Sequence, residues 1–204
     1  DLVVTGVQTC ALPILFSIFP GSRTSEINIL TPILFEFIKK MNMKYKDLFF
    51  VFHSTQEHVQ LLQKQLLDEG LKNCGAIADE KIKSHVLKSS VFAVAKSGTI
   101  SLEICNSKIP SIIIYKMGAI NFFIVKMLVK VKFANIINIA AGEEVIPELL
   151  QSKCNAKDIY NTVDKLMNDK TALENQLDKT QSIISNFKTG KSSEIASSIL
   201  NDYI

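Results

Sequence analysis

From residue 15 onward, the sequence alternates between short apolar runs and longer segments whose apolar residues have helical spacing. Short runs rich in Val, Ile and Phe are typical of buried strands. The runs are residues 15–19, 48–53, 74–78, 91–95 and 110–115. Strands that alternate with helices in this way form a parallel sheet covered by helices. The sequence therefore predicts an α/β fold, with a Rossmann-like parallel sheet and flanking helices.

The segments between the runs place apolar residues three or four positions apart, which is the pattern of an amphipathic helix. These segments are residues 25–41, 56–71, 80–89 and 99–107. Residues 155–204 keep this spacing without a strand-like run, so we expect terminal helices there, the last at 192–204. No linker rich in Pro, Gly or Ser divides the chain, and 204 residues is an ordinary domain length. Residues 15–204 are expected to form one domain.

The charge balance limits the class of partner. The formal net charge is +3, without the clustered basic stripe of a dedicated nucleic-acid binder. We therefore expect no nucleic-acid partner, whereas a phosphate-bearing small ligand or an anionic membrane surface stays open.

Cysteine and histidine spacing predicts no metal site. The four cysteines form no C-x-x-C pair, and the three histidines have no ligand spacing: Cys10, Cys74, Cys105, Cys154, His53, His58 and His85. Reduced thiols indicate a cytoplasmic chain, and Cys105 is expected to be a buried small side chain. No G-x-G-x-x-G and no G-x-x-x-x-G-K-[ST] follows a predicted strand, which argues against a dinucleotide dehydrogenase and a kinase.

The N-terminus carries no basic region before its apolar residues, so no signal peptide is predicted. Residues 120–141 are the most apolar stretch, but Lys126, Lys130 and Lys132 make a membrane span unfavourable. Residues 116–132 suggest either a helix lying peripherally on the inner membrane or a core helix with lysines that reach solvent. Both interpretations stay open.

The first candidate motif is Phe19-Pro20-Gly21-Ser22-Arg23, at a predicted strand end where a helix begins. Free backbone amides and the positive end of the helix dipole favour an anion at such a junction. Gly21 permits close backbone approach, and the Arg23 guanidinium matches phosphate oxygens. The alternative is an ordinary turn in which Arg23 pairs with Glu26 at the surface.

The second motif, Ser97-Gly98-Thr99, also ends a strand and opens a helix, with Glu103 one turn later. Ligands of open parallel sheets collect at the carboxyl ends of strands, so the two loops could meet around one phosphorylated ligand. The hydroxyls of Ser97 and Thr99 would then contact phosphate, and Glu103 would accept hydrogen bonds from ribose. The alternative is that Thr99 only caps its helix and Glu103 is solvated.

A third motif combines Asn138 with a following Ala-Ala-Gly and then Pro147-Glu148-Leu149-Leu150-Gln151. Pro147 suits the first turn of a short helix. On such a helix Glu148 and Gln151 would share a face and could present a carboxylate and an amide to one ligand. An ordinary helix start is the alternative.

Taken in order, the motifs FPGSR, SGTISLE, PSIIIYKM, NIAAG and PELLQ closely resemble the C-terminal half of lipid-A-disaccharide synthases, inverting glycosyltransferases of the GT-B fold. The resemblance runs from Phe16 to the C-terminus. It implies transfer of 2,3-diacylglucosamine from UDP-2,3-diacylglucosamine to 2,3-diacylglucosamine 1-phosphate with release of UDP, in lipid A biosynthesis. It implies no metal and no organic cofactor, and a homodimer for the full-length enzyme.

The resemblance also implies roles for individual residues. Arg23 matches an arginine that we expect to stabilise the charge growing on the UDP diphosphate, and Asn138 matches an asparagine important for activity. Glu103 matches an acidic residue for which ribose binding is expected. The full UDP-sugar site expected here is Gly21, Ser22, Arg23, Ser97, Gly98, Thr99, Glu103, Asn138, Glu148 and Gln151.

Two departures from the family pattern stand out. The N-terminal half, which binds the acceptor and supplies the general base, is missing, so we expect this chain to bind UDP without making disaccharide. Residues 1–14 do not match the family and look like translated adapter sequence. The alternative functions are half of another UDP-sugar transferase or epimerase, and a nucleotide-binding module without chemistry.

Overall fold

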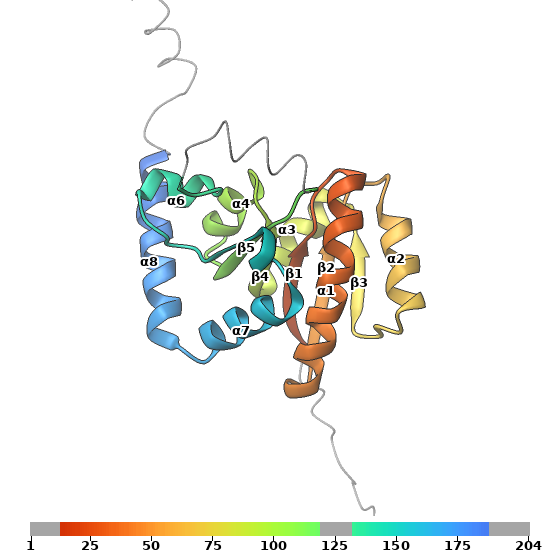
Figure 1. Ribbon diagram of the computed structural model, residues 1–204. Helices are drawn as coiled ribbons and strands as arrows, with labels where there is room; N and C mark the ends of the chain where they lie inside the picture. Colours follow the sequence, from red (N-terminus) through yellow and green to blue (C-terminus); the bar gives the residue numbers. More distant parts are fainter. Residues whose placement is uncertain (1–12, 119–131, 188–204) are drawn as a thin grey trace, which may run out of the picture.

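The computed structural model describes residues 13–118 and 132–187 of the chain. Six parallel strands form one sheet in the order β3-β2-β1-β4-β5-β6 (Figure 1). The strands are β1 (Ile14–Phe19), β2 (Leu48–His53), β3 (Cys74–Ile77), β4 (Ser90–Lys96), β5 (Ser111–Tyr115) and β6 (Glu148–Leu150). The predicted Rossmann-like parallel sheet is confirmed, and all five predicted strands are present.

Helices connect the strands and follow the sheet. They are α1 (Thr24–Lys44), α2 (Val59–Asp68), α3 (Glu80–Ser89), α4 (Ile100–Asn106), α6 (Ile136–Ala141), α7 (Ala156–Met167) and α8 (Lys170–Phe187). The four helices predicted between strands are confirmed with small shifts of their ends, and α7 and α8 confirm the helical interpretation of residues 155–187.

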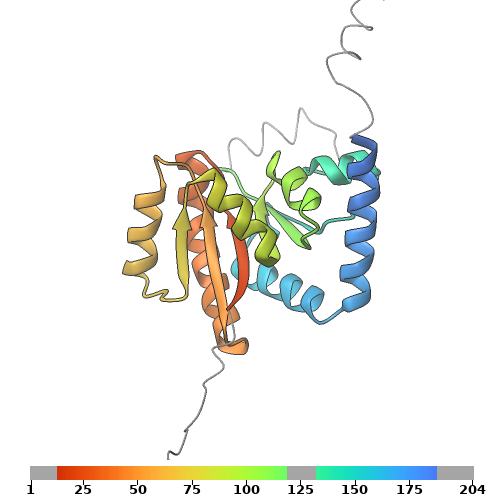
Figure 2. The same ribbon diagram turned by 180° about the vertical axis from the view of Figure 1, so that it is seen from behind.

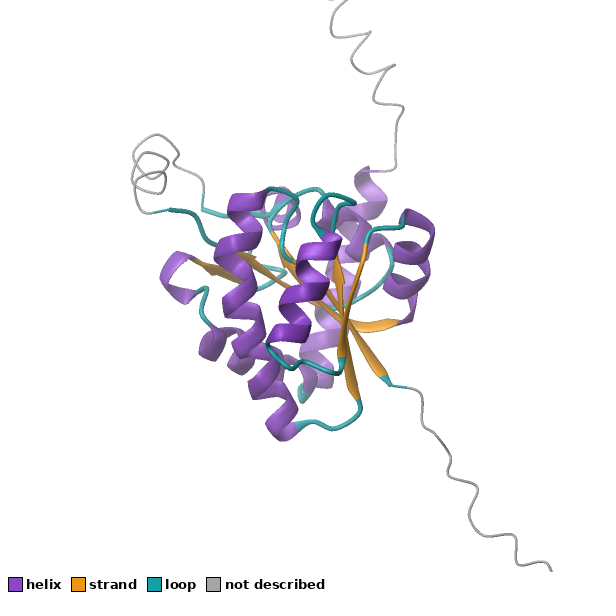
Figure 3. Cartoon of the chain, turned by 90° about the vertical axis from the view of Figure 1, so that its right-hand side faces the viewer, coloured by secondary structure: helices purple, strands orange, loops and turns teal. Residues whose placement is uncertain are grey.

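Alternating side chains of the strands feed two separate cores. Phe16 and Phe92 point to the face covered by α1, α2 and α7, whereas Phe19 and Ala93 point to the face covered by α3, α4, α6 and α8. Figures 1 and 2 show these two faces, and Figure 3 shows helices on either side of the strands. On the first face the ring of Phe16 lies 5.6 Å from that of Phe92. Burying each such side chain contributes roughly 1.5–3 kcal/mol of transfer free energy.

The prediction of a helix beginning at Pro147 is wrong. Residues 148–150 form strand β6, and Gln151–Lys153 form a 3-10 turn, so Glu148 and Gln151 do not share a helix face. Pro147 is tolerated because β6 is an edge strand, where the missing N–H breaks no ladder, and the Pro147 carbonyl accepts a hydrogen bond from the Ile113 amide at 2.9 Å. A strand of three residues is too short to show alternation in the sequence.

Some predictions fall on residues that the structure does not describe. These are the adapter-like segment except Pro13 and Ile14, most of the membrane-surface segment 116–132, and the last predicted helix at 192–204. Ile14 belongs to β1, so the strand begins inside the segment interpreted as foreign. In residues 13–118 and 132–187, no helix is long and apolar enough to cross a bilayer.

Candidate functional site

The chain reverses its direction of growth across the sheet between β1 and β4. From β1 the chain builds β2 and β3 on one side, and from β4 it builds β5 and β6 on the other. Phe19 at the end of β1 pairs in register with Ala95 of β4, so the loops that follow both strands leave the sheet side by side. In open α/β sheets this switch point is where ligands bind. The two motif loops are thus placed on the same edge, as predicted.

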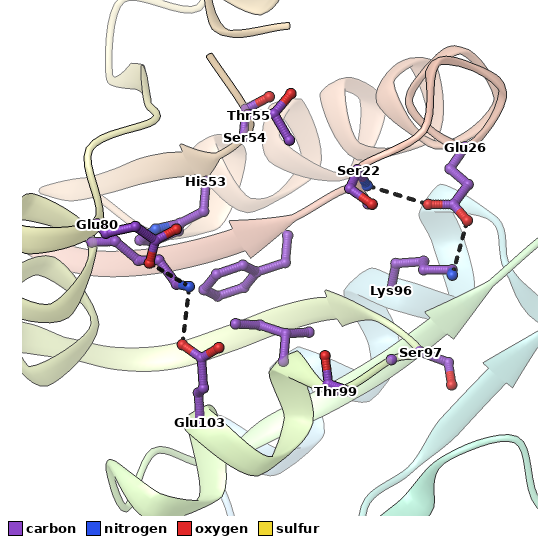
Figure 4. A pocket seen from close by; sticks show the side chains of 15 residues that line it. Ser22, Glu26, His53, Ser54, Thr55, Glu80, Lys96, Ser97, Thr99 and Glu103 are labelled. Carbon is purple, nitrogen blue, oxygen red and sulfur yellow. Dashed lines mark hydrogen bonds and ion pairs between the residues drawn. The ribbon is translucent and has the colours of Figure 1, made fainter. Parts of the chain in front are cut away.

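A cavity of about 270 Å³ opens at this edge (Figure 4). Its volume is near the lower end of the range of ligand pockets, about 300–1000 Å³. It is lined by three strand-end loops and by residues of α1, α3 and α4: Phe19, Gly21, Ser22, Glu26, His53, Ser54, Thr55, Glu80, Lys83, Lys96, Ser97, Gly98, Thr99, Ile100 and Glu103. Six of the predicted site residues are therefore brought together: Gly21, Ser22, Ser97, Gly98, Thr99 and Glu103.

The loop after β1 is built around Gly21, whose φ of 109° suits glycine. A Cβ at this position would lie 2.4 Å from Glu26 Oε2, so no side chain fits without displacing that carboxylate. Glu26 Oε2 accepts hydrogen bonds from the Ser22 amide at 3.2 Å and the Arg23 amide at 3.5 Å. The amides predicted to hold an anion are thus occupied by the carboxylate of Glu26.

Arg23 lies at the rim rather than in the cavity. Its side chain is 79% exposed, and Nη1 lies 3.4 Å from Glu26 Oε1. The structure therefore shows the surface pair that the sequence left as an alternative. Such exposed pairs contribute only about 0–1 kcal/mol, so little opposes a new partner for the guanidinium. Arg23 is the only arginine of the chain, and hence its only planar phosphate-binding fork.

The loop after β4 is held by side-chain bonds of serines. Ser97 Oγ donates to the Ala134 carbonyl at 2.7 Å, and Ser101 Oγ donates to the Gly98 carbonyl at 2.7 Å. Thr99 occupies the N-cap position of α4 but makes no capping bond with its side chain. The side chain of Thr99 therefore does not cap the helix, and Thr99 lines the cavity; its contact with phosphate stays a prediction.

Acidic and basic side chains alternate around the cavity. Lys83 bridges Glu80 and Glu103, at 3.0 Å each, and Lys96 lies 2.9 Å from Glu26 Oε1. Glu103 is 53% exposed but is paired rather than simply solvated. Burial alone would lower the pKa of Lys83, yet the bonds from Glu103 and Glu80 outweigh it and raise the pKa. Lys83 is therefore positively charged in the cavity wall.

Glu26 is ionised for a similar reason. Burial alone would raise its pKa, but the hydrogen bond and charge of Lys96 and the amides of Arg23 and Ser22 outweigh burial. The pKa of Glu26 consequently lies below its ordinary value.

Asn138, predicted to contact substrate, is fully buried outside the cavity. Its Nδ2 donates to the Ile146 carbonyl and to Glu148 Oε1, both at 2.7 Å, and its Oδ1 accepts from the amides of Val145 and Ile146, both at 2.9 Å. These bonds fold residues 138–148 into a closed turn. A direct role of Asn138 in binding stays a prediction.

Glu148 continues this network toward the cavity. Oε2 accepts from the Ala134 amide at 2.7 Å and Oε1 from the Asn135 amide at 3.0 Å. The Ala134 carbonyl in turn accepts from Ser97, which lines the cavity. Asn138 and Glu148 thus support the position of the second motif loop from behind. Gln151 has a φ of 51° and follows β6 at the same edge of the sheet, outside the cavity lining.

Several cavity residues were missed from the sequence. No role was predicted for Lys96, Glu26 was considered only as a partner for Arg23, and His53 only as a histidine without ligand spacing. Lys96 and His53 are polar residues at the ends of apolar strands, a signal that became informative only once the strand order was known. His58 lies outside the cavity lining and was likewise assigned no role. Its ring lies 2.8 Å from Thr55 Oγ1 and 3.0 Å from Thr24 Oγ1, so it links the loop after β2 to the start of α1.

Cys74, Cys105 and Cys154, the cysteines of the described residues, are free thiols. Cys105 is buried against α8, as predicted, and burial raises the pKa of its thiol to about 12. Within the same residues no group of three or more His, Cys, Asp or Glu could hold a metal ion.

Comparison with known protein families gives a match over nearly the whole chain. The family model described as lipid-A-disaccharide synthetase matches residues 11–200. The lipid-A-disaccharide synthase of Sulfurihydrogenibium sp. (strain YO3AOP1) is 35% identical over 170 residues, covering 79% of this chain and 44% of that protein. The synthase of Rickettsia prowazekii (strain Madrid E) is 34% identical over 164 residues, covering 80% and 43%. The chain spans less than half the length of these relatives.

Solved structures with the same fold include nucleotide-sugar enzymes. A glycosyltransferase from Rickettsia africae ESF-5 superimposes with a TM-score of 0.58 at 12% identity, covering 87% of this chain and 44% of that one. A UDP-GlcNAc 2-epimerase from Neisseria meningitidis bound to UDP-GlcNAc gives a TM-score of 0.55 at 14% identity, covering 90% and 46%. At these identities the likeness concerns the fold alone.

Proposed function

Because the chain belongs to the lipid-A-disaccharide synthetase family, we propose that it binds the UDP moiety of UDP-2,3-diacylglucosamine. The sugar would pass to 2,3-diacylglucosamine 1-phosphate with release of UDP. The observation that carries the proposal is the cavity shared by the loops after β1 and β4, at the switch point of the sheet.

The diphosphate fits between the two loops. The N-terminus of α1, a helix of 21 residues, directs its positive dipole end to the cavity beside Ser22, and a phosphate that displaces the Glu26 carboxylate would meet the amides of Ser22 and Arg23. Facing it, Ser97 and Thr99 line the wall at the start of α4. Because Gly21 has no side chain, an anion can approach the backbone of this loop closely.

The charge of the diphosphate is matched by Lys96 and Arg23. Both contact Glu26, whose carboxylate accepts hydrogen bonds from the amides of Ser22 and Arg23. A bound phosphate takes the place of this carboxylate and leaves the two cations facing the ligand. Negative charge grows on UDP as the glycosidic bond breaks, and cations fixed at that point stabilise the transition state.

Other parts of the proposed function follow from the family. Glu103 keeps unpaired carboxylate lone pairs beside Lys83 and accepts from ribose hydroxyls. The chain spans less than half the length of its relatives, so UDP binding is proposed for this chain and the complete transfer reaction for the full-length enzyme. Acylated substrates bring the cytoplasmic enzyme to the inner-membrane surface as a peripheral protein, with a homodimer as the full-length form.

Isothermal titration calorimetry with UDP tests this function. Arg23→Ala should weaken UDP binding by roughly tenfold or more, as expected for a charge-assisted hydrogen bond. Lys165→Ala, an exposed lysine of α7 remote from the cavity lining, is the matched control and should leave the affinity unchanged. Absence of UDP binding, or equal affinity of Arg23→Ala and the parent chain, would overturn the proposal.

A further inference from the structure

His53 is the last residue of β2 and forms part of the cavity wall. Its side chain is 5% exposed, and its ring stacks on Phe19 with the centroids 4.2 Å apart and the planes at 11°. The ring is therefore held in one orientation. His53 belongs to none of the three sequence motifs and has no role in the proposed binding of the diphosphate.

The protonation of the ring follows from a chain of hydroxyl bonds behind it. Ser90 Oγ donates its only hydrogen to the Val86 carbonyl at 2.9 Å. The 2.8 Å contact between Ser90 and Ser17 must therefore use the Ser17 hydrogen. Ser17 has no second hydrogen to give, so its 2.9 Å contact with His53 Nε2 requires that Nε2 carry the proton. The neutral ring then leaves Nδ1 as a bare acceptor.

Nδ1 has no hydrogen-bond partner in the described residues, although it is buried. Burial and then the positive charge of Lys83 lower the pKa of His53 to about 3, so the ring stays neutral and Nδ1 unprotonated at physiological pH. A buried acceptor without a partner costs about 1–3 kcal/mol. Unpaired buried polar atoms of this kind in a cavity wall are candidates for ligand contact.

The position of His53 in the cavity indicates which part of the ligand it would contact. Figure 4 shows Ser22, Glu26 and Lys96 toward one end of the cavity, and His53, Glu80 and Glu103 toward the other. Lys83, which bonds Glu80 and Glu103, also acts on the charge of His53. With the diphosphate between Ser22 and Ser97, the nucleoside extends toward His53.

We propose that His53, held as the Nε2–H tautomer by Ser17, accepts a hydrogen bond at Nδ1 from a neutral donor of the bound nucleotide, a ribose hydroxyl or the base N–H. A phosphate oxygen is excluded as the partner, because it also only accepts. His53 is thus a specificity-determining residue, and this inference rests on the proposed UDP site.

The tautomer can be measured directly in the full chain. Long-range proton–nitrogen NMR spectra distinguish protonated from bare imidazole nitrogens. Without ligand, Nε2 of His53 should be protonated and Nδ1 bare, and added UDP should shift the Nδ1 resonance while the tautomer stays. A proton on Nδ1 in the free chain, or an Nδ1 resonance that ignores saturating UDP, would overturn the inference.

Two variants of His53 distinguish the role of Nδ1 as an acceptor from the role of the hydrogen bond between Nε2 and Ser17. Gln at position 53 places an amide nitrogen about where Nε2 lies and keeps the bond to Ser17, but it removes the acceptor. Asn places a carbonyl oxygen about where Nδ1 lies and gives up Ser17. His53→Gln should weaken UDP binding roughly fivefold to tenfold, and His53→Asn by much less. A purely structural role predicts the reverse order, because only His53→Asn breaks the serine chain.

Analogues of UDP identify the donor. The 2′-deoxy, 3′-deoxy and N3-methyl forms are titrated into the parent chain and into His53→Gln. The analogue that lacks the donor should bind the parent chain roughly fivefold to tenfold less well than UDP does. Its affinity for His53→Gln should equal its affinity for the parent chain, because the hydrogen bond is absent in both complexes. If every analogue loses the same factor in both chains, the inference fails while the UDP site stands. If UDP itself does not bind the parent chain, the proposed function and the inference both fail.

Discussion

Glu26 Oε1 lies 2.9 Å from Lys96 Nζ, and this ion pair joins the first turn of α1 to the end of β4 across the switch point of the sheet. Both side chains are largely buried. The carboxylate also holds the Ser22 amide and therefore fixes the loop that the diphosphate would meet. The Glu26 side chain thus holds the first motif loop in place and also positions Lys96, which precedes the second motif loop.

The pair should make stability depend on pH in the acid range. Because the pKa of Glu26 in the folded chain is below its ordinary value of 4.5, its contribution is present above that pH and is lost as pH falls through the lowered pKa. In urea unfolding, the parent chain should exceed Glu26→Gln in free energy of unfolding near neutral pH, with the difference shrinking below about pH 4.5. Glu174→Gln, which removes an exposed carboxylate from α8, should show little difference at any pH. A constant difference for Glu26→Gln down to strongly acid pH would contradict the expectation.

Replacing Gly21 should damage both folding and binding. Alanine there adopts an unfavourable φ and places its Cβ against Glu26 Oε2, so Gly21→Ala should lower the free energy of unfolding by about 1–3 kcal/mol. Gly75→Ala is the matched control, since its Cβ meets only Phe49 at ordinary contact distance. Urea denaturation measures both variants, and calorimetry with UDP should show weaker binding for Gly21→Ala alone. Equal stability of the two variants would show that the strain at Gly21 is absent.

Asn138 should matter chiefly through stability. Asn138→Ala abandons four hydrogen bonds of a fully buried side chain, and a loss of about 3 kcal/mol or more is expected. Asn138→Asp keeps the shape but sets a carboxylate oxygen against Glu148 Oε1 and the Ile146 carbonyl, so it should be no more stable than alanine.

The exposed Asn161→Ala on α7 serves as the control for Asn138 and should change the free energy of unfolding by less than about 0.5 kcal/mol. Thermal unfolding followed by circular dichroism gives the order of all three variants. Full stability of Asn138→Ala, combined with lost UDP binding, would instead favour the direct contact that the family resemblance implies.

Gln176 should anchor α8 to the sheet. Its side chain is buried, with Oε1 accepting from the Ser111 amide at 2.8 Å and Nε2 donating to the Ser111 carbonyl at 3.0 Å. Gln176→Ala leaves both backbone groups without this partner, which should cost about 1–3 kcal/mol, whereas the exposed Gln60→Ala on α2 should cost little. Hydrogen exchange of the Ser111 amide provides a local readout, and unchanged protection in Gln176→Ala would refute the anchoring role.

Local pattern was sufficient for most of the fold. Runs such as residues 48–53 are apolar on both sides because both faces of a parallel strand are covered, and this can be read from neighbouring residues alone. Strand β6 was missed because it is three residues long and is defined by its pairing with β5, which lies more than thirty positions earlier.

The site divides in the same way. Gly21, Ser22 and the turn of Ser97 to Thr99 were predictable, because a glycine or hydroxyl between a strand and a helix is a local feature with a direct physical meaning. Whether Glu148 faces a ligand or the Asn138 side chain depends on which groups packing brings within 3 Å, and no spacing encodes that. The bare nitrogen of His53 likewise exists because Ser17 and Ser90 come from different strands that pair. Periodicity along the chain thus determined the elements and their loops, whereas the hydrogen-bond partners of buried polar groups were decided only by the tertiary structure, since these partners come from segments distant in sequence.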